Sequence, residues 1–242
     1  MTRIYQSCPL AENSIITLDE VASHHLARVL RANVGEEIIL FNGLGGEYSG
    51  VIQQINKKTV TVNLKQFIER EVESALNISL AQGISRGEKM DYTIQKAVEL
   101  GVKQVIPLFT ERCNVKLDTE RSEKRLQHWQ SVVISACEQS GRNHVPEVKI
   151  PQSLENWLPT VKADVCLVLS PYAEFKLKNL SISATANVIL LIGPEGGLSD
   201  REVSLTTQYG FLPLNLGPRV LRTETAAVAA ITALQSSYGD MK

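Results

Sequence analysis

The chain of 242 residues has few cysteines and no long apolar segment. Its four cysteines form no CxxC pair and no zinc-ligand pattern with histidine, so the sequence predicts no metal site. The cysteines are expected to be reduced thiols in a cytoplasmic protein. Apolar runs such as Val188–Ile192 are far shorter than a membrane span, and the N-terminus lacks the pattern of a signal peptide. These absences argue against a disulfide-stabilised, zinc-dependent or membrane protein.

Excess charge is also missing, because 25 Lys and Arg are balanced by 26 Asp and Glu, for a net charge of −1. Proteins that bulk charge holds to nucleic acid usually carry a basic footprint, so any contact with RNA must come from local patches. The chain has no P-loop, no GxGxxG after an early strand, no GxSxG elbow and no HExxH helix. A ligand site in this chain must therefore work through backbone and shape.

The first 72 residues have the pattern of a small β domain with one helix. Short turns separate the expected strands, which are residues 3–6, 14–18, 37–41, 47–55 and 59–66. Thr17–Glu20 matches a capping box that would open the helix. Because closure removes the exposed edges of short strands, this pattern predicts a small β-barrel.

A polar linker around residues 69–74 separates this region from residues 73–242, where strands and helices alternate. Strands are expected at 77–84, 103–109, 164–170, 187–192 and 211–216, and helices at 88–100, 120–140, 199–210 and 223–237. The strands at 164–170 and 187–192 are almost entirely apolar, which is typical of a parallel sheet buried on both faces. The second domain is therefore predicted to be α/β.

Two loops of the second domain stand out. Ile192–Ser199 reads IGPEGGLS and Leu216–Ala226 reads LGPRVLRTETA, and each follows an expected strand. Ligands of open α/β sheets bind at the carboxyl ends of the strands, and glycines let the backbone approach them closely. One such loop alone would be an ordinary turn. Two of them, the second with Arg219, Arg222 and Glu224, predict a binding site.

These two loops resemble the two most specific segments of the 16S ribosomal RNA uridine-N3-methyltransferase family. Three further segments resemble weaker family patterns, namely HxxxVLR at His25–Arg31, KxxELGV at Lys96–Val102 and AxEQSxR at Ala136–Arg142. The resemblance extends over nearly the whole chain. It implies a PUA-like RNA-binding barrel at 1–72 and, at 73–242, a SPOUT methyltransferase domain with a trefoil knot.

The resemblance also implies a methyl donor, S-adenosylmethionine, in a pocket made by the knot loops, and a homodimer through the SPOUT domain. On this basis we expect the donor to contact Leu169, Gly193, Pro194, Glu195, Gly196, Leu216, Gly217, Leu221, Arg222, Thr223, Thr225 and Ala226.

Methylation of uridine N3 requires loss of the N3 proton and stabilisation of the charge that develops on the uracil oxygens. Arg222 is the candidate to stabilise that charge or to bind a target phosphate, and the alternative is a structural ion pair with Glu138 or Glu224. Glu138 or Glu224 could accept the proton. For Glu224, the alternative role is that of a carboxylate in the first turn of a helix.

Arg28, Arg31 and Arg142 are candidate RNA contacts, although exposed arginines often only aid solubility. Arg28 and Arg31 are three residues apart and could share one helix face. The expected substrate is 16S rRNA in the assembled small ribosomal subunit, because a nearly neutral protein would bind free RNA weakly. The alternatives are an RNA-binding module without catalysis, a nucleotide-dependent reductase, or the same chemistry on another RNA.

Overall fold

The computed structural model describes residues 1–113 and 119–242, and the chain folds as two compact units. Unit 1 comprises Met1–Glu73 and Cys137–Val145, and unit 2 comprises Ser74–Ala136 and Pro146–Lys242. The first break lies next to the boundary that we expected after residue 72. The second break falls inside the long helix α3 (Thr119–Ser140), so no single linker in the sequence could have marked it.

Unit 1 is built on one five-stranded sheet. Its strands are β1 (Thr2–Tyr5), β2 (Ile15–Thr17), β3 (Glu37–Phe41), β4 (Glu47–Ile55) and β5 (Val60–Ile68), in the order β1-β3-β4-β5-β2. Only β1 and β3 pair in parallel, and the other pairs are antiparallel. Alternate residues of the strands, such as Val60, Val62 and Leu64, are completely buried in one apolar core. The expected strands of this region are thus present, with ends shifted by up to two residues.

The helix of unit 1 begins later than the capping-box pattern predicts. Asp19 is the N-cap residue, and its carboxylate accepts a hydrogen bond of 2.8 Å from the Ala22 amide at the start of α1 (Glu20–His24). Thr17 ends β2 instead, so the expected cap at Thr17 is wrong. The helix continues as the π-helical turn η1 (His25–Val29), which the resemblance to HxxxVLR did not predict.

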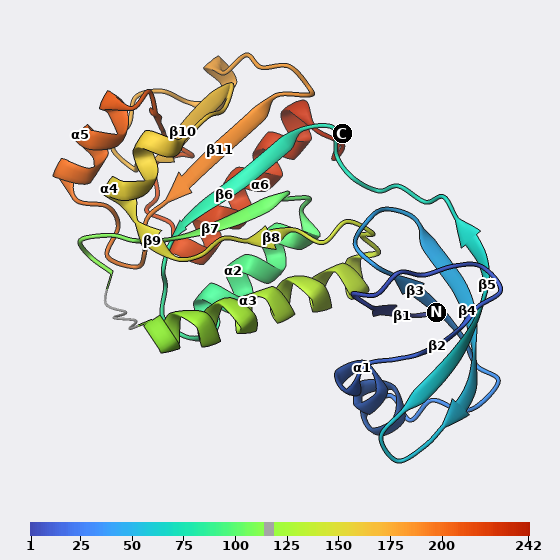
Figure 1. Ribbon diagram of the computed structural model, residues 1–242. Coiled ribbons are helices and arrows are strands. Elements are labelled where there is room, and N and C mark those ends of the chain that lie inside the picture. The colour runs from blue at the N-terminus through green and yellow to red at the C-terminus, as the bar shows by residue number, and fades with distance from the viewer. Residues whose placement is uncertain (114–118) are drawn as a thin grey trace. The chain divides into compact units, whose positions relative to one another are not determined.

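Unit 2 contains a seven-stranded sheet in which all pairs are parallel. Its strands are β6 (Asn77–Gly83), β7 (Gln104–Phe109), β8 (Glu147–Val148), β9 (Gln152–Ser153), β10 (Val165–Leu169), β11 (Asn187–Ile192) and β12 (Leu212–Leu214). The order is β12-β10-β11-β6-β7-β8, with β9 also paired to β7. The carboxyl ends of β10, β11 and β12 are therefore neighbours at one edge of the sheet. Figure 1 shows β10 and β11 side by side. The predicted α/β class with a parallel sheet is confirmed.

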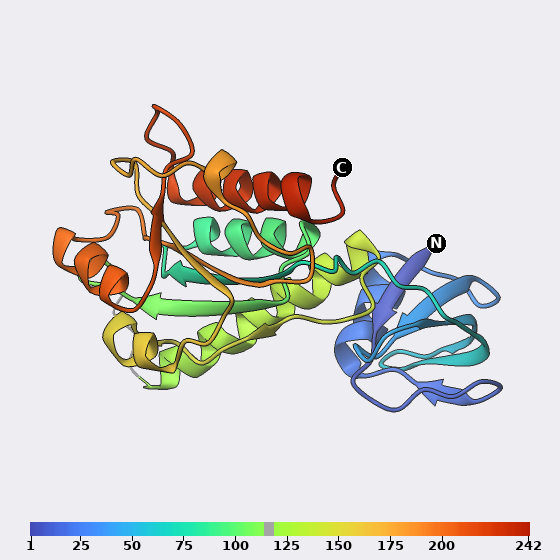
Figure 2. The same cartoon turned by 90° about the horizontal axis from the view of Figure 1, so that it is seen from above.

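Helices cover both faces of this sheet. The longer ones besides α3 are α2 (Glu88–Glu99), α5 (Asp200–Gln208) and α6 (Thr223–Tyr238), and the short ones are α4 (Leu154–Trp157), η2 (Leu158–Thr160) and η3 (Leu177–Asn179). Helices α2 and α6 pack side by side on one face (Figure 2). On the other face, Trp157 of α4 packs with Phe211 over Ile189 and Leu191 of β11. No helix in the described ranges is long and apolar enough to span a membrane.

The short elements between Glu147 and Thr160 were not expected from the sequence. Strands β8 and β9 have two residues each and α4 has four, so none is long enough to show a hydrophobic period. One local signal is present, because Ser153 caps α4 by accepting a hydrogen bond of 3.2 Å from the Asn156 amide. The segment is held mainly by tertiary packing, with Leu154, Trp157 and Leu158 buried.

Candidate functional site

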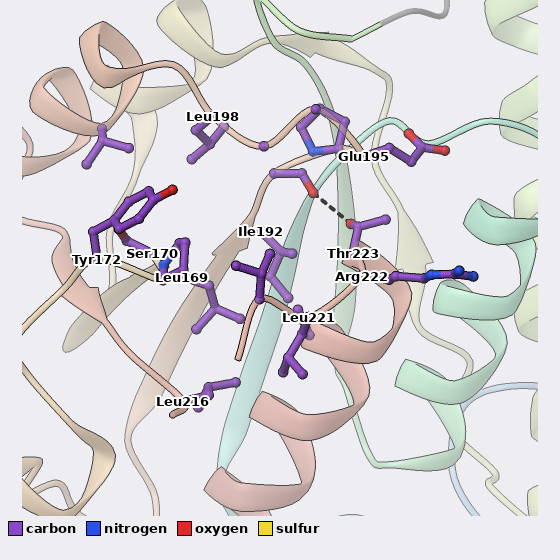
Figure 3. Close-up of a pocket in the computed structure, with 18 of the residues that line it drawn as sticks. Leu169, Ser170, Tyr172, Ile192, Glu195, Leu198, Leu216, Leu221, Arg222 and Thr223 are labelled. Atoms are coloured by element: carbon purple, nitrogen blue, oxygen red, sulfur yellow. Dashed lines mark hydrogen bonds between the residues drawn. The ribbon is translucent and has the colours of Figure 1, made fainter. Parts of the chain in front are cut away.

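A cavity of about 850 Å³ lies at the carboxyl ends of β10, β11 and β12 in unit 2. Its walls come from the loop after β10, from both loops singled out in the sequence and from the start of α6 (Figure 3). Leu169, Leu216 and Leu221 form its apolar centre. Cavities of roughly 300–1,000 Å³ with mostly apolar walls are typical sites for small molecules.

The loop after β11 forms a wall made of backbone. A Cβ atom on Gly193 would lie 2.8 Å from the Leu198 nitrogen and 2.9 Å from the Gly197 carbonyl carbon. These distances are too short for any side chain, so the loop folds on itself only because glycine stands at position 193. Gly83, at the end of β6, has the same constraint, since a Cβ there would lie 2.6 Å from the ring of Pro194. The sequence GPEGG therefore specifies a tightly folded loop.

Gln82, the penultimate residue of β6, fixes this loop to α6. Its side-chain nitrogen donates to the Gly193 carbonyl at 3.3 Å and to the Thr223 hydroxyl at 3.0 Å. The Thr223 hydroxyl donates in turn to the same Gly193 carbonyl at 2.7 Å, as the dashed line in Figure 3 marks. Gln82 is fully buried. This network sets the orientation of the Gly193 peptide, and the sequence offered no motif that would have identified Gln82.

Asn215 connects the loops that follow β10 and β12. Its side-chain nitrogen donates to the Pro171 carbonyl at 2.6 Å, and its side-chain oxygen accepts from the Gly217 amide at 2.6 Å. Gly217 has φ of 134°, which side chains rarely tolerate. The cavity wall between Leu169 and Leu216 is thus set by one asparagine and one glycine.

Charged side chains surround the apolar centre. Lys89, Arg112, Arg219 and Arg222 line the cavity together with Glu195, Asp200 and Glu224. Glu195 accepts a hydrogen bond of 3.0 Å from the Arg86 amide and lies 3.7 Å from the Lys89 ammonium group. Arg112 donates to the Gly196 carbonyl at 3.1 Å. The cavity can therefore accommodate both an apolar group and an anionic one.

The structure brings most of the expected donor-binding residues together. Those that line the cavity are Leu169, Gly193, Pro194, Glu195, Gly196, Leu216, Gly217, Leu221, Arg222, Thr223 and Ala226. Thr225 does not line it and is exposed, which corrects our expectation. The reason is helical geometry, because successive residues of α6 turn by about 100° and Thr225 faces away from Thr223 and Ala226.

Several lining residues were missed, among them Lys89, Arg112 and Tyr172. Two of them could have been found from position alone. Lys89 lies in the first turn of α2, the helix after β6, and Arg112 follows the end of β7, so both lie at the edge of the sheet where ligands of such folds bind.

Arg222 and Glu224 both line the cavity. Arg222 is exposed, and its side chain extends away from the apolar centre in Figure 3. It makes no ion pair with Glu138 or Glu224 in the described part of the chain, contrary to the alternative role we considered. Glu224 stands in the first turn of α6, and one of its carboxylate oxygens is buried without a hydrogen-bond partner among the described residues.

Glu138 is not among the lining residues and belongs to unit 1. Its carboxylate accepts a hydrogen bond of 3.0 Å from the Tyr5 amide in β1. Burial raises the pKa of Glu138 above its usual value of 4.5, and the hydrogen bond from Tyr5 opposes that shift. The structure therefore gives Glu138 a place in the packing of unit 1.

Arg142 corrects a second expectation, because it is buried within unit 1 and only 4% exposed. Its guanidinium donates two hydrogen bonds to the Glu73 carboxylate, at 2.7 and 2.6 Å, and the Glu73 side chain is only 7% exposed. A guanidinium fixed in this way is not available to RNA. The neighbouring Asn143, which is completely buried, accepts a hydrogen bond of 2.6 Å from Arg3 and donates one of 3.0 Å to the Arg70 carbonyl.

Arg28 and Arg31 are exposed, as an RNA contact would require. They do not share a helix face, however, because the π-helical turn ends at Val29 and Arg31 follows it with φ of 52°. The spacing argument for this pair is therefore wrong, although each arginine stays a candidate RNA contact by its exposure.

The sequence matches two family models. Residues 72–235 match an RNA methyltransferase domain, and residues 18–65 match an RNA methyltransferase PUA domain. The chain is 41% identical over 240 residues to the ribosomal RNA small subunit methyltransferase E of Buchnera aphidicola from Schizaphis graminum. This match covers 99% of this chain and 97% of the relative. The protein of that name from Bacillus subtilis is 33% identical over 227 residues, covering 90% and 88% of the two chains.

Two solved structures are similar over nearly their full length. A methyltransferase of Legionella pneumophila, in complex with S-adenosylmethionine, superposes with a TM-score of 0.96 at 44% identity, covering 99% of this chain and 98% of that one. The ribosomal RNA small subunit methyltransferase E of Neisseria gonorrhoeae, also bound to S-adenosylmethionine, gives a TM-score of 0.93 at 37% identity and covers all of both chains.

Proposed function

The chain belongs to the ribosomal RNA small subunit methyltransferase E family, and we propose that it transfers a methyl group from S-adenosylmethionine to N3 of one uridine in 16S rRNA. It is a SPOUT methyltransferase with a PUA-like N-terminal domain. The single observation that carries the proposal is the cavity in unit 2, where two glycine-rich loops meet at the carboxyl ends of neighbouring parallel strands.

The residues of this cavity fit the methyl donor. Leu169, Leu216 and Leu221 would contact the faces of its adenine ring, and the Gly193–Gly197 loop would place backbone groups against its polar parts. The backbone of this loop is already folded against itself, so it would hold the donor without rearranging. S-adenosylmethionine, when bound, supplies a methyl group that its sulfonium makes electrophilic.

The protein's own side chains would prepare the uridine. The neutral imide of uracil is a poor nucleophile, so the N3 proton has to be removed, and charge then spreads onto O2 and O4. Arg222 is our candidate to stabilise that charge, because it lines the cavity, is exposed and is unpaired in the described part of the chain. Glu224 is our candidate to accept the proton, since it lines the same cavity whereas Glu138 does not.

The proposed substrate is 16S rRNA in the assembled small ribosomal subunit. The net charge of −1 gives little general attraction to RNA, so the shape of a folded particle would have to supply part of the recognition. Arg28 and Arg31 on unit 1 are candidate contacts to phosphates. We also propose that the SPOUT domain forms a homodimer, and a ribosomal substrate would place the enzyme in the cytoplasm.

A methyl-transfer assay with labelled S-adenosylmethionine tests the proposal. The substrates are unmethylated small subunits, naked 16S rRNA and transfer RNA, and reverse transcription then locates the label. A methyl group on N3 blocks the pairing edge, so the expected result is label in small subunits with one transcriptase stop at a uridine. Label without a stop would contradict methylation of N3. If no RNA were labelled, methyl transfer would be refuted and the alternative of an RNA-binding module without catalysis would be favoured.

A further inference from the structure

Tyr172 is an aromatic side chain that lines the donor cavity and yet is 89% exposed. It follows β10, and Figure 3 shows its ring on the opposite side of the apolar centre from Arg222. Single exposed apolar residues are common on protein surfaces and need no explanation. A second exposed apolar residue, Val220, which is 77% exposed, lines the same cavity.

The backbone that carries Tyr172 is held in place on both sides. The Ser170 amide donates to the Leu214 carbonyl at 3.0 Å, and the Pro171 carbonyl accepts from Asn215 at 2.6 Å. A turn follows, closed by a hydrogen bond of 3.3 Å from the Ala173 amide to the Ser170 carbonyl. The aromatic ring is thus presented to solvent from a fixed loop, which lowers the entropic cost of binding a flat partner.

The surroundings of the ring favour a nucleic acid. Arg219 and Arg222 line the cavity, are exposed and have no partner in the part of the chain that the structure describes. Arginine binds phosphate oxygens well, so these two cations match the backbone of an RNA strand that enters the cavity. An exposed aromatic ring and unpaired arginines that line one cavity are the side chains used to bind single-stranded RNA.

The proposed reaction adds a requirement for such a ring. N3 lies on the pairing edge of uracil, so the target uridine must leave its helix or loop stack before it can react. Unstacking is unfavourable and exposes the faces of the target and its neighbours, and stacking on an aromatic side chain can offset part of that cost. We infer that Tyr172 stacks on an unpaired base of the substrate RNA at the mouth of the donor cavity, an inference that rests on the proposed function.

Three variants test the inference. Tyr172→Ala removes the ring, Tyr172→Phe keeps it, and Tyr209→Ala is a matched control at a tyrosine that is 44% exposed and does not line the cavity. Affinity for unmethylated small subunits is measured by filter binding, KM by methyl transfer, and donor affinity by titration calorimetry. We expect Tyr172→Ala to weaken binding of small subunits and raise their KM by roughly 5- to 150-fold, the range that base–aromatic stacking gives. Tyr172→Phe and Tyr209→Ala should match the wild type in both, and all three should bind the donor normally.

Three results would overturn the inference. Unchanged affinity of Tyr172→Ala for small subunits would show that no base stacks on the ring. Loss of donor affinity with unchanged affinity for small subunits would show that the ring covers the donor. If light scattering showed that Tyr172→Ala is a monomer where the wild type is a dimer, the ring would lie in a subunit interface. A wild-type enzyme that transfers no methyl group would refute the proposed function. The stacking of Tyr172 would still be tested, because filter binding of small subunits does not depend on methyl transfer.

Discussion

Two of the segments that resemble family motifs behave in opposite ways. The Leu216–Ala226 loop of unit 2 places Arg219 and Arg222 on the wall of a cavity, exposed and unpaired in the described part of the chain. The ACEQSGR segment, residues 136–142, also contains an arginine and a glutamate. There Arg142 is buried against Glu73, and Glu138 bonds to the Tyr5 amide.

The difference shows what a charged motif can and cannot indicate. Ionised groups avoid the interior unless they are paired and hydrogen-bonded, so a buried arginine has a structural partner and an exposed unpaired one keeps its charge for a ligand. A pattern of residue types is the same in both cases. Substitution of each charged residue in turn separates its effect on stability from its effect on methyl transfer.

The largest effect is expected from Arg142→Ala. Its loss would leave the buried Glu73 carboxylate without its guanidinium partner, and breaking a buried pair in this way usually costs about 3–5 kcal/mol. Urea denaturation of the variant should show this loss in the free energy of unfolding. The matched control is Arg28→Ala in the same unit, where an exposed arginine should change stability by less than about 0.5 kcal/mol. Equal stabilities of the two variants would contradict a structural role for Arg142.

The opposite pattern is expected from Arg222→Ala. Removing one group that stabilises developing charge lowers kcat by roughly 100- to 1,000-fold in other enzymes, and we expect a similar loss of methyl transfer here. The free energy of unfolding should not change, because the side chain is exposed and unpaired in the described ranges. Donor affinity, measured by calorimetry, should stay within a few fold. Normal turnover in Arg222→Ala would refute its assignment.

A smaller and more specific effect is expected from Gln82→Leu. The change keeps the size of the side chain but removes the hydrogen bonds to the Gly193 carbonyl and the Thr223 hydroxyl. Because the loop at Gly193 would lose its anchor, we expect donor affinity to fall by roughly tenfold, the worth of one or two hydrogen bonds. The measurement is the dissociation constant of S-adenosylmethionine.

Thr223 provides the control for Gln82. Thr223→Ser keeps the hydroxyl that bonds the Gly193 carbonyl at 2.7 Å and should bind the donor normally, whereas Thr223→Val should resemble Gln82→Leu. If Gln82→Leu binds the donor as tightly as the wild type does, the network does not position the loop.

Much of the fold could be predicted from periodicity. The limits of β3, β4 and β11 match the expected strands to the residue, because each is a run of apolar or alternating residues between turns. The cavity could be placed as well, since loops after neighbouring parallel strands meet at one edge of the sheet. Local patterns carry this information directly.

The rest depended on tertiary contacts that no local pattern encodes. The sequence around Arg142 does not show that it would be buried against Glu73, which is 69 residues away along the chain. Nor does any spacing rule identify Gln82, whose partners Gly193 and Thr223 are brought to it by the sheet order β11-β6 and by α6. The π-helical turn that contains Arg28 and ends before Arg31 was also missed, because residue spacing alone does not distinguish it from an α-helix.

The smallest effect is expected from Glu138→Gln. Burial raises the pKa of Glu138 above 4.5, so the folded state favours the protonated carboxyl group. The protonated carboxyl therefore contributes stability below the pKa of the unfolded chain, and this stability is lost as the pH rises through the pKa of the folded protein. Glutamine does not titrate and can still accept the hydrogen bond from the Tyr5 amide. The variant should therefore gain stability relative to the wild type as pH rises above 4.5, as urea denaturation at several pH values would show. Methyl transfer should stay normal in Glu138→Gln and fall in Glu224→Gln, because only Glu224 lines the cavity. If transfer fell equally in both variants, the ACEQSGR segment would take part in the reaction, and burial alone would not separate the two motifs.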